Sequence, residues 1–260
     1  MIVSAISLFS QGIEGKNVVL QAGRRDRVLQ MAGSSTAPVI GPGSLVHSAS
    51  QKGDMPVAPG TLVSIYGSNL AFENEKPIVL LGGQPLPVLF SNSEQINAQV
   101  PFALLVNTAH QVVVRRGEML SVPETFVVAS AQPGIFSVDQ SGTGQGVVIG
   151  ADERSIADKA NPAERGKPIV IYCTGLGAVV PVGEFGKPAP TEVLFATTAE
   201  VQVAVGGKPA AVHFSGLTPG FIGLYQVNAL IPTDTATGDS IPLSIASQGQ
   251  TSNTVTIGVR

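Results

Sequence analysis

Short apolar runs separated by turn-forming residues are the dominant pattern along the chain. The run LVSIY at 62–66 has the length and the Val/Ile content of a mostly buried strand. Glycine pairs followed by Gln-Pro at 82–85 or Lys-Pro at 206–209 reverse the chain between two such runs, which predicts β-hairpins. Helical signal is confined to 24–31 and 154–160, where we expect two turns each. The pattern predicts an all-β protein of many short strands.

The same series of strand motifs occurs twice. GTLVSIYGSNL, LGGQPLPVLFS and INAQVP begin at residues 60, 81 and 96, and GKPIVIYCTGL, VGGKPAAVHFS and VNALIP begin at 166, 205 and 227. Their order is kept while the spacing between copies grows, so the second copy is the first with longer loops. The additional residues lie in 177–200 and around 216–224. We interpret the chain as a tandem duplication.

Each copy has several strands, short turns and little helix, which is typical of an antiparallel β-sandwich. We therefore expect one sandwich at 45–132 and a second, with the longer loops, at 133–260. Residues 1–44 lie outside the duplication and carry three apolar patches between glycine-containing turns. This β-rich N-terminal extension is predicted to hold either the last strands of a preceding domain or strands that add to an open sheet edge of this chain or of a neighbour.

Composition narrows the class of protein. Of the 260 residues, 43% are hydrophobic and 13% are charged, which excludes intrinsic disorder. A net charge of −3 gives no basic surface for nucleic acid, and no apolar run approaches the ~18–20 residues of a membrane span. We expect neither nucleic acid binding nor membrane insertion. The single cysteine, Cys173, allows no intrachain disulfide and is expected to be a buried, inert thiol.

Motifs for catalysis or cofactor binding are not found. The histidines His47, His110 and His213 are far apart, and His213 stands where the first copy has Leu89, so we expect it to pack inside the protein. SGTGQG at 141–146 leads into an apolar run and not into a helix, so it lacks the helix N-terminus that binds a dinucleotide. We expect no catalytic residue, no cofactor and no metal site.

Calcium is the one metal that the residues leave open. Asp139, Asp152, Glu153 and Asp158 lie in the segment between the two copies, and calcium prefers oxygen ligands from loops. Their spacing is not that of an EF-hand, and solvated loop carboxylates are the ordinary interpretation of such a segment.

Several motifs in order carry a family resemblance. APGTLVSIYGSNLA, GGQPLPVLF and INAQVP, followed by GGKPAAVHFSGLTPGFIGLYQVNALIP and SNTVTIGVR, resemble a conserved C-terminal domain pair of soil acidobacteria of the Solibacter type, over residues 44–260. Each half is also similar to the IPT/TIG class, although the second half has Cys173 where the first has Gly67. The resemblance implies tandem immunoglobulin-like sandwiches in a secreted or cell-surface bacterial protein, without enzymatic activity and without catalytic residues.

We therefore expect a non-enzymatic structural or adhesion module that spaces or presents attached domains, with a protein or polysaccharide at the cell surface as partner. Self-assembly into a homo-oligomer through the N-terminal strands is a variant of this interpretation. The alternative is a module that binds extracellular polysaccharide with the longer loops of the second copy. Because sugar faces stack on exposed aromatic rings, Phe221 and Tyr225 are the candidate ligand-binding residues.

Overall fold

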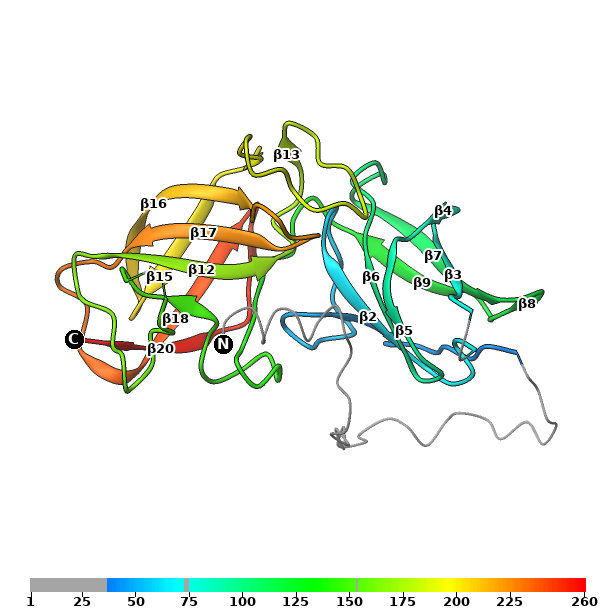
Figure 1. Ribbon diagram of the computed structural model, residues 1–260, viewed down its shortest axis with the longest axis horizontal. Helices are drawn as coiled ribbons and strands as arrows, with labels where there is room; N and C mark the ends of the chain where they lie inside the picture. The colour runs from blue at the N-terminus through cyan, green and yellow to red at the C-terminus, as the bar shows by residue number, and fades with distance from the viewer. Residues whose placement is uncertain (1–36, 73–74, 153) are drawn as a thin grey trace.

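The computed structural model describes residues 37–72, 75–152 and 154–260, and in these ranges all regular structure is β (Figure 1). Two antiparallel β-domains follow one another, which confirms the expected all-β fold class. The strands expected within residues 1–36 lie outside the described residues. Val39 bridges Ser68 and Ile40 is buried in the first core, so this part of the predicted extension packs with the first domain.

The expected helical turns at 154–160 are wrong. Ile156 forms an antiparallel bridge with Ile149, and Ala157 is buried in the second core. The Asp158 carboxylate accepts the amide protons of Ala160 and Asn161. A short acidic side chain that bonds its own downstream backbone competes with helix formation, so the segment forms bends.

The first domain consists of two sheets that enclose one core. One sheet has the order β1-β2-β6-β5, and the other has the order β4-β3-β7-β8, with β9 also pairing β7. Along β7, Val112 and Val114 are buried and their neighbours are more exposed, as expected for a strand with one face on a core. The strands are β1 (Leu45–His47), β2 (Leu62–Tyr66), β3 (Ile78–Leu81), β4 (Gln84–Pro85), β5 (Val88–Ser91), β6 (Gln95–Gln99), β7 (Thr108–Arg116), β8 (Met119–Leu120) and β9 (Glu124–Val128).

In the second domain one long strand joins both sheets. β16 pairs with β15 through its first residues and with β17 from Ala211 onward, within the order β10-β12-β17-β16-β15-β18-β19. In the first domain the equivalent stretch is divided into β4 and β5, because Pro87 stands in place of Ala211 and has no amide proton for the ladder. The strands are β10 (Gly134–Ile135), β11 (Val148–Ile149), β12 (Pro168–Thr174), β13 (Val179–Val180), β14 (Ala196–Thr197), β15 (Val201–Val205), β16 (Lys208–Leu217), β17 (Tyr225–Leu230), β18 (Gly238–Ser247), β19 (Gln250–Thr251) and β20 (Val255–Val259).

The two domains repeat even an irregularity of pairing. β5 and β16 each carry one bulge residue, Leu89 in the first domain and His213 in the second. Leu89 packs against apolar residues between the domains, whereas His213 is exposed. The expectation that His213 packs inside the protein is therefore wrong. The bulge residue lies on the outside of its own domain in both copies, and only the first has a neighbour to cover it.

A buried joint connects the two domains. The Thr174 hydroxyl, on β12, accepts a hydrogen bond from the Leu62 amide of the first domain at 3.0 Å and donates one to the Gly223 carbonyl at 2.9 Å. Because the Leu62 amide and the Gly223 carbonyl are both satisfied by this hydroxyl and the surrounding contacts are apolar, this part of the joint resembles the interior of a single domain. Its apolar residues come from both domains: Ala49, Leu62 and Leu89 from the first, and Phe136, Val147, Tyr172, Phe221 and Leu224 from the second.

His47 fastens the chain segment between the domains. Its Nε2 lies 3.0 Å from the Gln132 carbonyl and its Nδ1 accepts the Ser50 amide proton at 3.3 Å, so the neutral ring with a proton on Nε2 satisfies both contacts. A Cβ on Gly134 would come 2.2 Å from the ring, so only glycine permits this approach. Burial lowers the pKa of His47 from 6.5 to about 4.

Replacing Thr174 by Val should weaken the joint. The valine has the same shape but leaves the buried Leu62 amide without an acceptor, which costs about 1–3 kcal/mol of unfolding free energy. The matched control is Thr198→Val, because Thr198 is exposed and its hydroxyl bonds only the Ala178 carbonyl. Urea denaturation should show the loss for Thr174→Val and less than about 0.5 kcal/mol for the control. Equal effects would contradict the assigned role of Thr174.

His47 should also make stability depend on pH. Between pH 6.5 and about 4 the unfolded chain binds a proton at this ring that the folded chain does not, so stability falls as pH falls through this window. The loss is on the order of 3 kcal/mol and is absent above the window. Subtracting the pH profile of His47→Gln removes the shared contribution of the carboxylates. Parallel profiles for the two proteins would show that the buried ring does not titrate as expected.

Candidate functional site

The two longer loops of the second domain lie side by side. The Ala189 amide donates to the Phe221 carbonyl at 3.0 Å, and the Gly220 amide donates to the Ala189 carbonyl at 2.8 Å. These bonds join the middle of 177–200 to 216–224, next to the joint between the domains. The two stretches that the sequence marks as additional to the second copy therefore form one surface.

The structure places the two predicted ligand-binding aromatics very differently. Tyr225 is fully buried, and its hydroxyl donates to the Gly177 carbonyl at 2.6 Å. Gly60 approaches so closely that a Cβ there would come 2.4 Å from the Tyr225 hydroxyl oxygen. Burial raises the pKa of Tyr225. This ring has no face accessible to a sugar.

Phe221 is half-buried and packs against the apolar cluster of the joint. Part of its surface stays exposed beside the second loop, which leaves its ligand-binding role a prediction. Sequence reasoning placed both aromatics correctly next to the insertion. It did not separate the fully buried Tyr225, which begins strand β17, from the partly exposed Phe221.

The loop 177–200 is also fastened to the first domain. The Gly186 amide donates to Gln99 Oε1 at 2.7 Å, and Gly183 lies against the ring of Phe102. Phe102 packs against the second core although it belongs to the first domain. The loop therefore spans the two domains and has a defined position on both.

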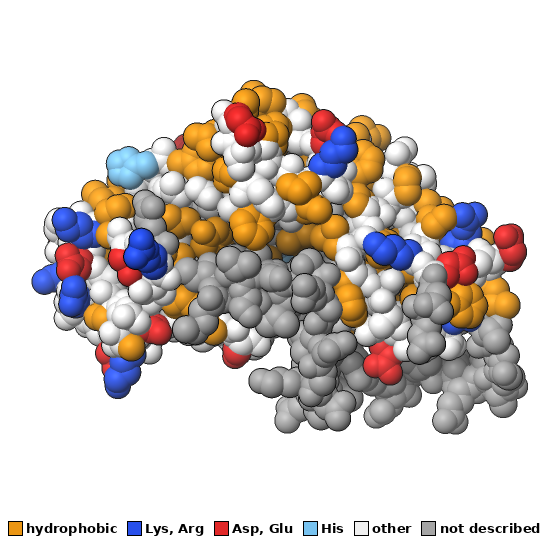
Figure 2. Space-filling view, in the orientation of Figure 1, with side chains coloured by type: hydrophobic (Ala, Val, Ile, Leu, Met, Phe, Trp, Pro, Cys, Tyr) orange, Lys and Arg blue, Asp and Glu red, His pale blue; other side chains and the backbone are white. Residues whose placement is uncertain are grey.

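Five exposed hydrophobic side chains of this loop are the main feature that the sequence analysis missed. Their exposed fractions range from 49% to 75%. Figure 2 shows hydrophobic side chains gathered at the top of the molecule, where β13 lies in Figure 1. The density of apolar residues between 179 and 195 was the available signal. We call the five residues the apolar loop patch: Val180, Val182, Phe185, Val193 and Leu194.

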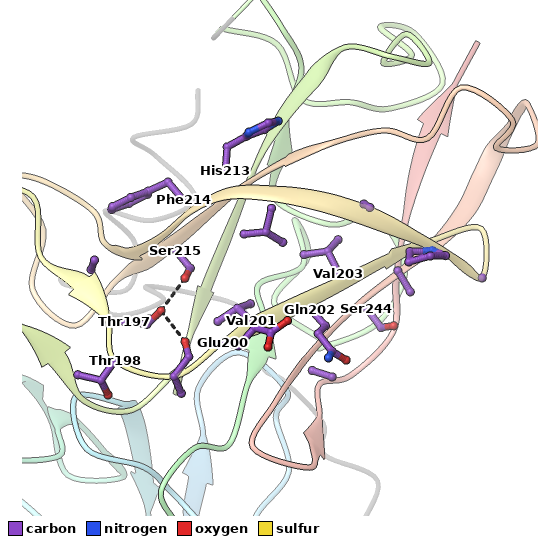
Figure 3. A pocket seen from close by; sticks show the side chains of 18 residues that line it. Thr197, Thr198, Glu200, Val201, Gln202, Val203, His213, Phe214, Ser215 and Ser244 are labelled. Atoms are coloured by element: carbon purple, nitrogen blue, oxygen red, sulfur yellow. Dashed lines mark hydrogen bonds between the residues drawn. The ribbon is translucent and has the colours of Figure 1, made fainter.

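A second surface feature is a hollow of about 990 Å³ between β14, β15, β16 and β18 (Figure 3). On one side Thr197 and Ser215 share a hydrogen bond of 2.5 Å, and the Thr197 hydroxyl also lies 3.0 Å from the Ala199 carbonyl. Figure 3 shows His213 pointing away from this pair. Most of the lining side chains are small and uncharged, so the hollow presents hydroxyls and methyl groups without a cluster of acids or bases.

The titratable candidates do not come together. His110 Nε2 bonds the Leu105 carbonyl at 2.8 Å, His47 is buried at the joint and His213 is exposed on β16. Cys173 is buried, and burial raises the pKa of its thiol.

The region described by the structure contains no helix long and apolar enough to cross a membrane.

The acidic residues of the joining segment serve their own turns. Asp139 accepts the amide and hydroxyl protons of Ser141. Asp152 accepts the amide protons of Arg154 and Ser155, and Asp158 accepts those of Ala160 and Asn161. Glu153 lies outside the described residues. Among residues 37–72, 75–152 and 154–260, no group of three His, Cys, Asp or Glu side chains could hold a metal ion.

Solved structures with a similar chain trace have low identity to this chain. The surface glycan-binding protein SGBP-B of Bacteroides ovatus, in complex with a mixed-linkage heptasaccharide, is 15% identical, with a TM-score of 0.37 over 86% of this chain and 46% of that chain. A surface glycan-binding protein of Prevotella bryantii is 11% identical, with a TM-score of 0.27 over 75% and 36%. The gamma-CGTase of Bacillus clarkii is 16% identical, with a TM-score of 0.31 over 85% and 25%. The chain spans less than half the length of each.

No curated protein matches the chain. The resemblance to the acidobacterial domain pair stays a prediction.

Residues 54–128, which contain β2 to β9, match the IPT/TIG domain family. This match agrees with the two-sheet antiparallel arrangement of that segment. The first sandwich is therefore an IPT/TIG domain with an immunoglobulin-like fold.

Proposed function

We propose that the protein is a non-enzymatic module of secreted or cell-surface proteins that holds two immunoglobulin-like sandwiches at one fixed angle. Its function is then mechanical: it spaces or presents the domains or partners attached to it. The IPT/TIG match in the first sandwich and the resemblance of residues 44–260 to exported domain pairs support this class of function.

The observation that carries the proposal is the character of the joint. Flexible domain pairs are connected by exposed linkers with few contacts across them. Here Gln132, in the connecting segment, is buried. Its carbonyl lies 3.0 Å from His47 Nε2, and its amide donates to the Gly175 carbonyl at 2.8 Å. With Thr174, Tyr225 and the apolar cluster, the linker becomes part of a packed interior, which favours one orientation.

Distance measurements between spin labels should detect this fixed orientation. Glu118→Cys and Gln250→Cys place one exposed label in each domain, and the native Cys173 is buried and should not react. The full chain should give one narrow distance distribution. Phe136→Ala removes a ring from the joint and should broaden it, whereas Phe72→Ala, which removes an exposed ring of the first domain, should not. A broad distribution in the unmodified joint would disprove the spacer function.

A second candidate function is binding of extracellular polysaccharide. It is favoured by the two longer loops, which lie together and carry the half-buried Phe221 and the exposed Phe185. Aromatic rings at such a place can stack on the apolar faces of sugars. This role would require the loops and not the joint.

Retention on insoluble glycans tests the second candidate. Phe221→Ala should lower retention several-fold, because stacking of one aromatic ring contributes about 0.5–1.5 kcal/mol beyond its buried area. Tyr225→Phe keeps the buried ring and should leave retention unchanged. Circular dichroism and thermal unfolding of both variants show whether the fold is intact. If the unmodified protein is not retained by any glycan of a broad panel, polysaccharide binding is excluded.

A further inference from the structure

His47 belongs to the first sandwich, but its ring packs against the backbone of the second. Its Nε2 lies 3.0 Å from the Gln132 carbonyl in the connecting segment. A Cβ on Gly134, in β10, would come 2.2 Å from the ring, and a Cβ on Gly175, directly after β12, would come 2.9 Å from Nε2. The second sandwich therefore contacts the ring closely at two places and restricts its movement while the joint is closed.

The closed joint fits the neutral ring and not its protonated form. Nδ1 accepts the Ser50 amide proton at 3.3 Å, so the proton of the neutral ring is on Nε2 and points to the Gln132 carbonyl. An imidazolium is a donor at both nitrogens. Its second proton, on Nδ1, would meet the Ser50 amide proton instead of an acceptor. When the joint opens, water can accept this proton, so protonation favours the open joint.

No charged side chain among the described residues offsets this conflict. The causes of the shift in the pKa of His47 are burial, which lowers it, and backbone hydrogen bonds, which raise it less. A carboxylate beside the ring would stabilise the imidazolium, but Asp139 bonds its own turn at Ser141. The titratable side chains on the segments around the ring are Lys52, Asp54, Tyr66, Asp139, Tyr172 and Cys173.

The joint contains less apolar packing than either sandwich. Its apolar cluster is much smaller than the core of the first domain or of the second. Gln132 is buried there, and both polar atoms of its side-chain amide lack a hydrogen-bond partner within the described chain. Such an amide lowers the stability of the closed joint, since opening lets water solvate it. We therefore expect the joint to separate at a lower cost in free energy than the unfolding of either core.

We propose that His47 is a pH-sensitive latch: protonation of its ring in acid releases the fixed angle between the two sandwiches while both stay folded. This inference rests on the proposed spacer function, because only a joint that is fixed at neutral pH can be released. It also differs from the pH dependence of unfolding described for His47 above. There the whole chain loses stability, whereas here the two sandwiches separate before either one unfolds.

Hydrogen exchange of the Leu62 amide, followed by NMR on the full chain, tests the latch. This amide bonds Thr174 across the joint, so its exchange reports opening of the joint. Because burial lowers the pKa of His47 from 6.5 to about 4, the opening equilibrium should rise roughly 100-fold between pH 7 and pH 4. The protection factor of Leu62, corrected for intrinsic exchange, should fall by that factor. The amides of Ile96 and Val227, in the two cores, should be better protected than Leu62 at every pH.

Three variants separate the latch from general effects of acid. His47→Gln has no titrating ring at the joint and should remove this 100-fold change. His213→Gln is the matched control, because it removes an exposed imidazole of the second sandwich and should keep the change. Phe136→Ala retains His47 but loosens the apolar cluster. It should lower the protection of Leu62 already at pH 7, and the protection should still fall as the pH is lowered.

Two results would overturn the latch. One is a protection factor of Leu62 that stays constant between pH 7 and pH 4, or that falls equally in His47→Gln. The other is equal protection of Leu62, Ile96 and Val227 at every pH, since the joint would then open only when the sandwiches unfold. The spin-label distances at pH 7 test the spacer function separately. A broad distribution there contradicts the fixed angle itself, whereas a narrow one together with pH-independent protection contradicts only the latch.

Discussion

The architecture depends on one hydrogen bond at the joint between the sandwiches, which gives the buried Leu62 amide an acceptor where water is excluded. The Leu62 amide begins a strand whose edge would otherwise end in the apolar interior, and the Thr174 hydroxyl provides its acceptor. The same hydroxyl donates onward to Gly223, so a single side chain connects three segments. Without this bond the apolar cluster would still be buried, but at the cost of an unsatisfied amide. Apolar burial thus stabilises the contact between the sandwiches, and the hydrogen bonds of Thr174 define which backbone groups meet there.

Much of the fold could be predicted from the chain alone. Runs such as LVSIY, the Gly-Gly reversals and the ordered repeat are local signals, and they are sufficient for two antiparallel sandwiches. The continuity of β16 across both sheets was not predicted, although its cause is local. It depends on the presence of an amide proton at Ala211, which Pro87 lacks in the first domain. The expected helix at 154–160 was wrong although its composition favours helix. Asp152 and Asp158 accept amide protons of the residues that follow them, and these bonds form turns instead.

The candidate site could be predicted only in part. The sequence shows where the second copy has longer loops, and the structure brings those loops together beside the joint. It does not show which aromatic residues point inward. Tyr225 and Phe221 are four residues apart, yet one is enclosed between Pro59 and Gly177 while the other reaches the surface. These two contacts come from residues 48 and 166 positions away, and no periodicity within one strand reports them. The exposed valines of 180–193 escaped notice for the same reason, since apolar residues in a β-protein are first assigned to its core.

The bulge residues Leu89 and His213 have a consequence for how such domains can be arranged in series. A leucine at this position gives the first sandwich an apolar outer face that a following sandwich can cover, as the second one does. At the equivalent face of the second sandwich, His213 and Pro168 replace the two leucines, Leu89 and Leu62, and both are exposed. A further sandwich stacked by the same contacts would have to desolvate an imidazole and would lack the strand amide that Thr174 receives. The two sandwiches are therefore similar in fold but not interchangeable in position. His213 and Pro168 do not provide the apolar surface and the amide proton that Leu89 and Leu62 provide at the joint.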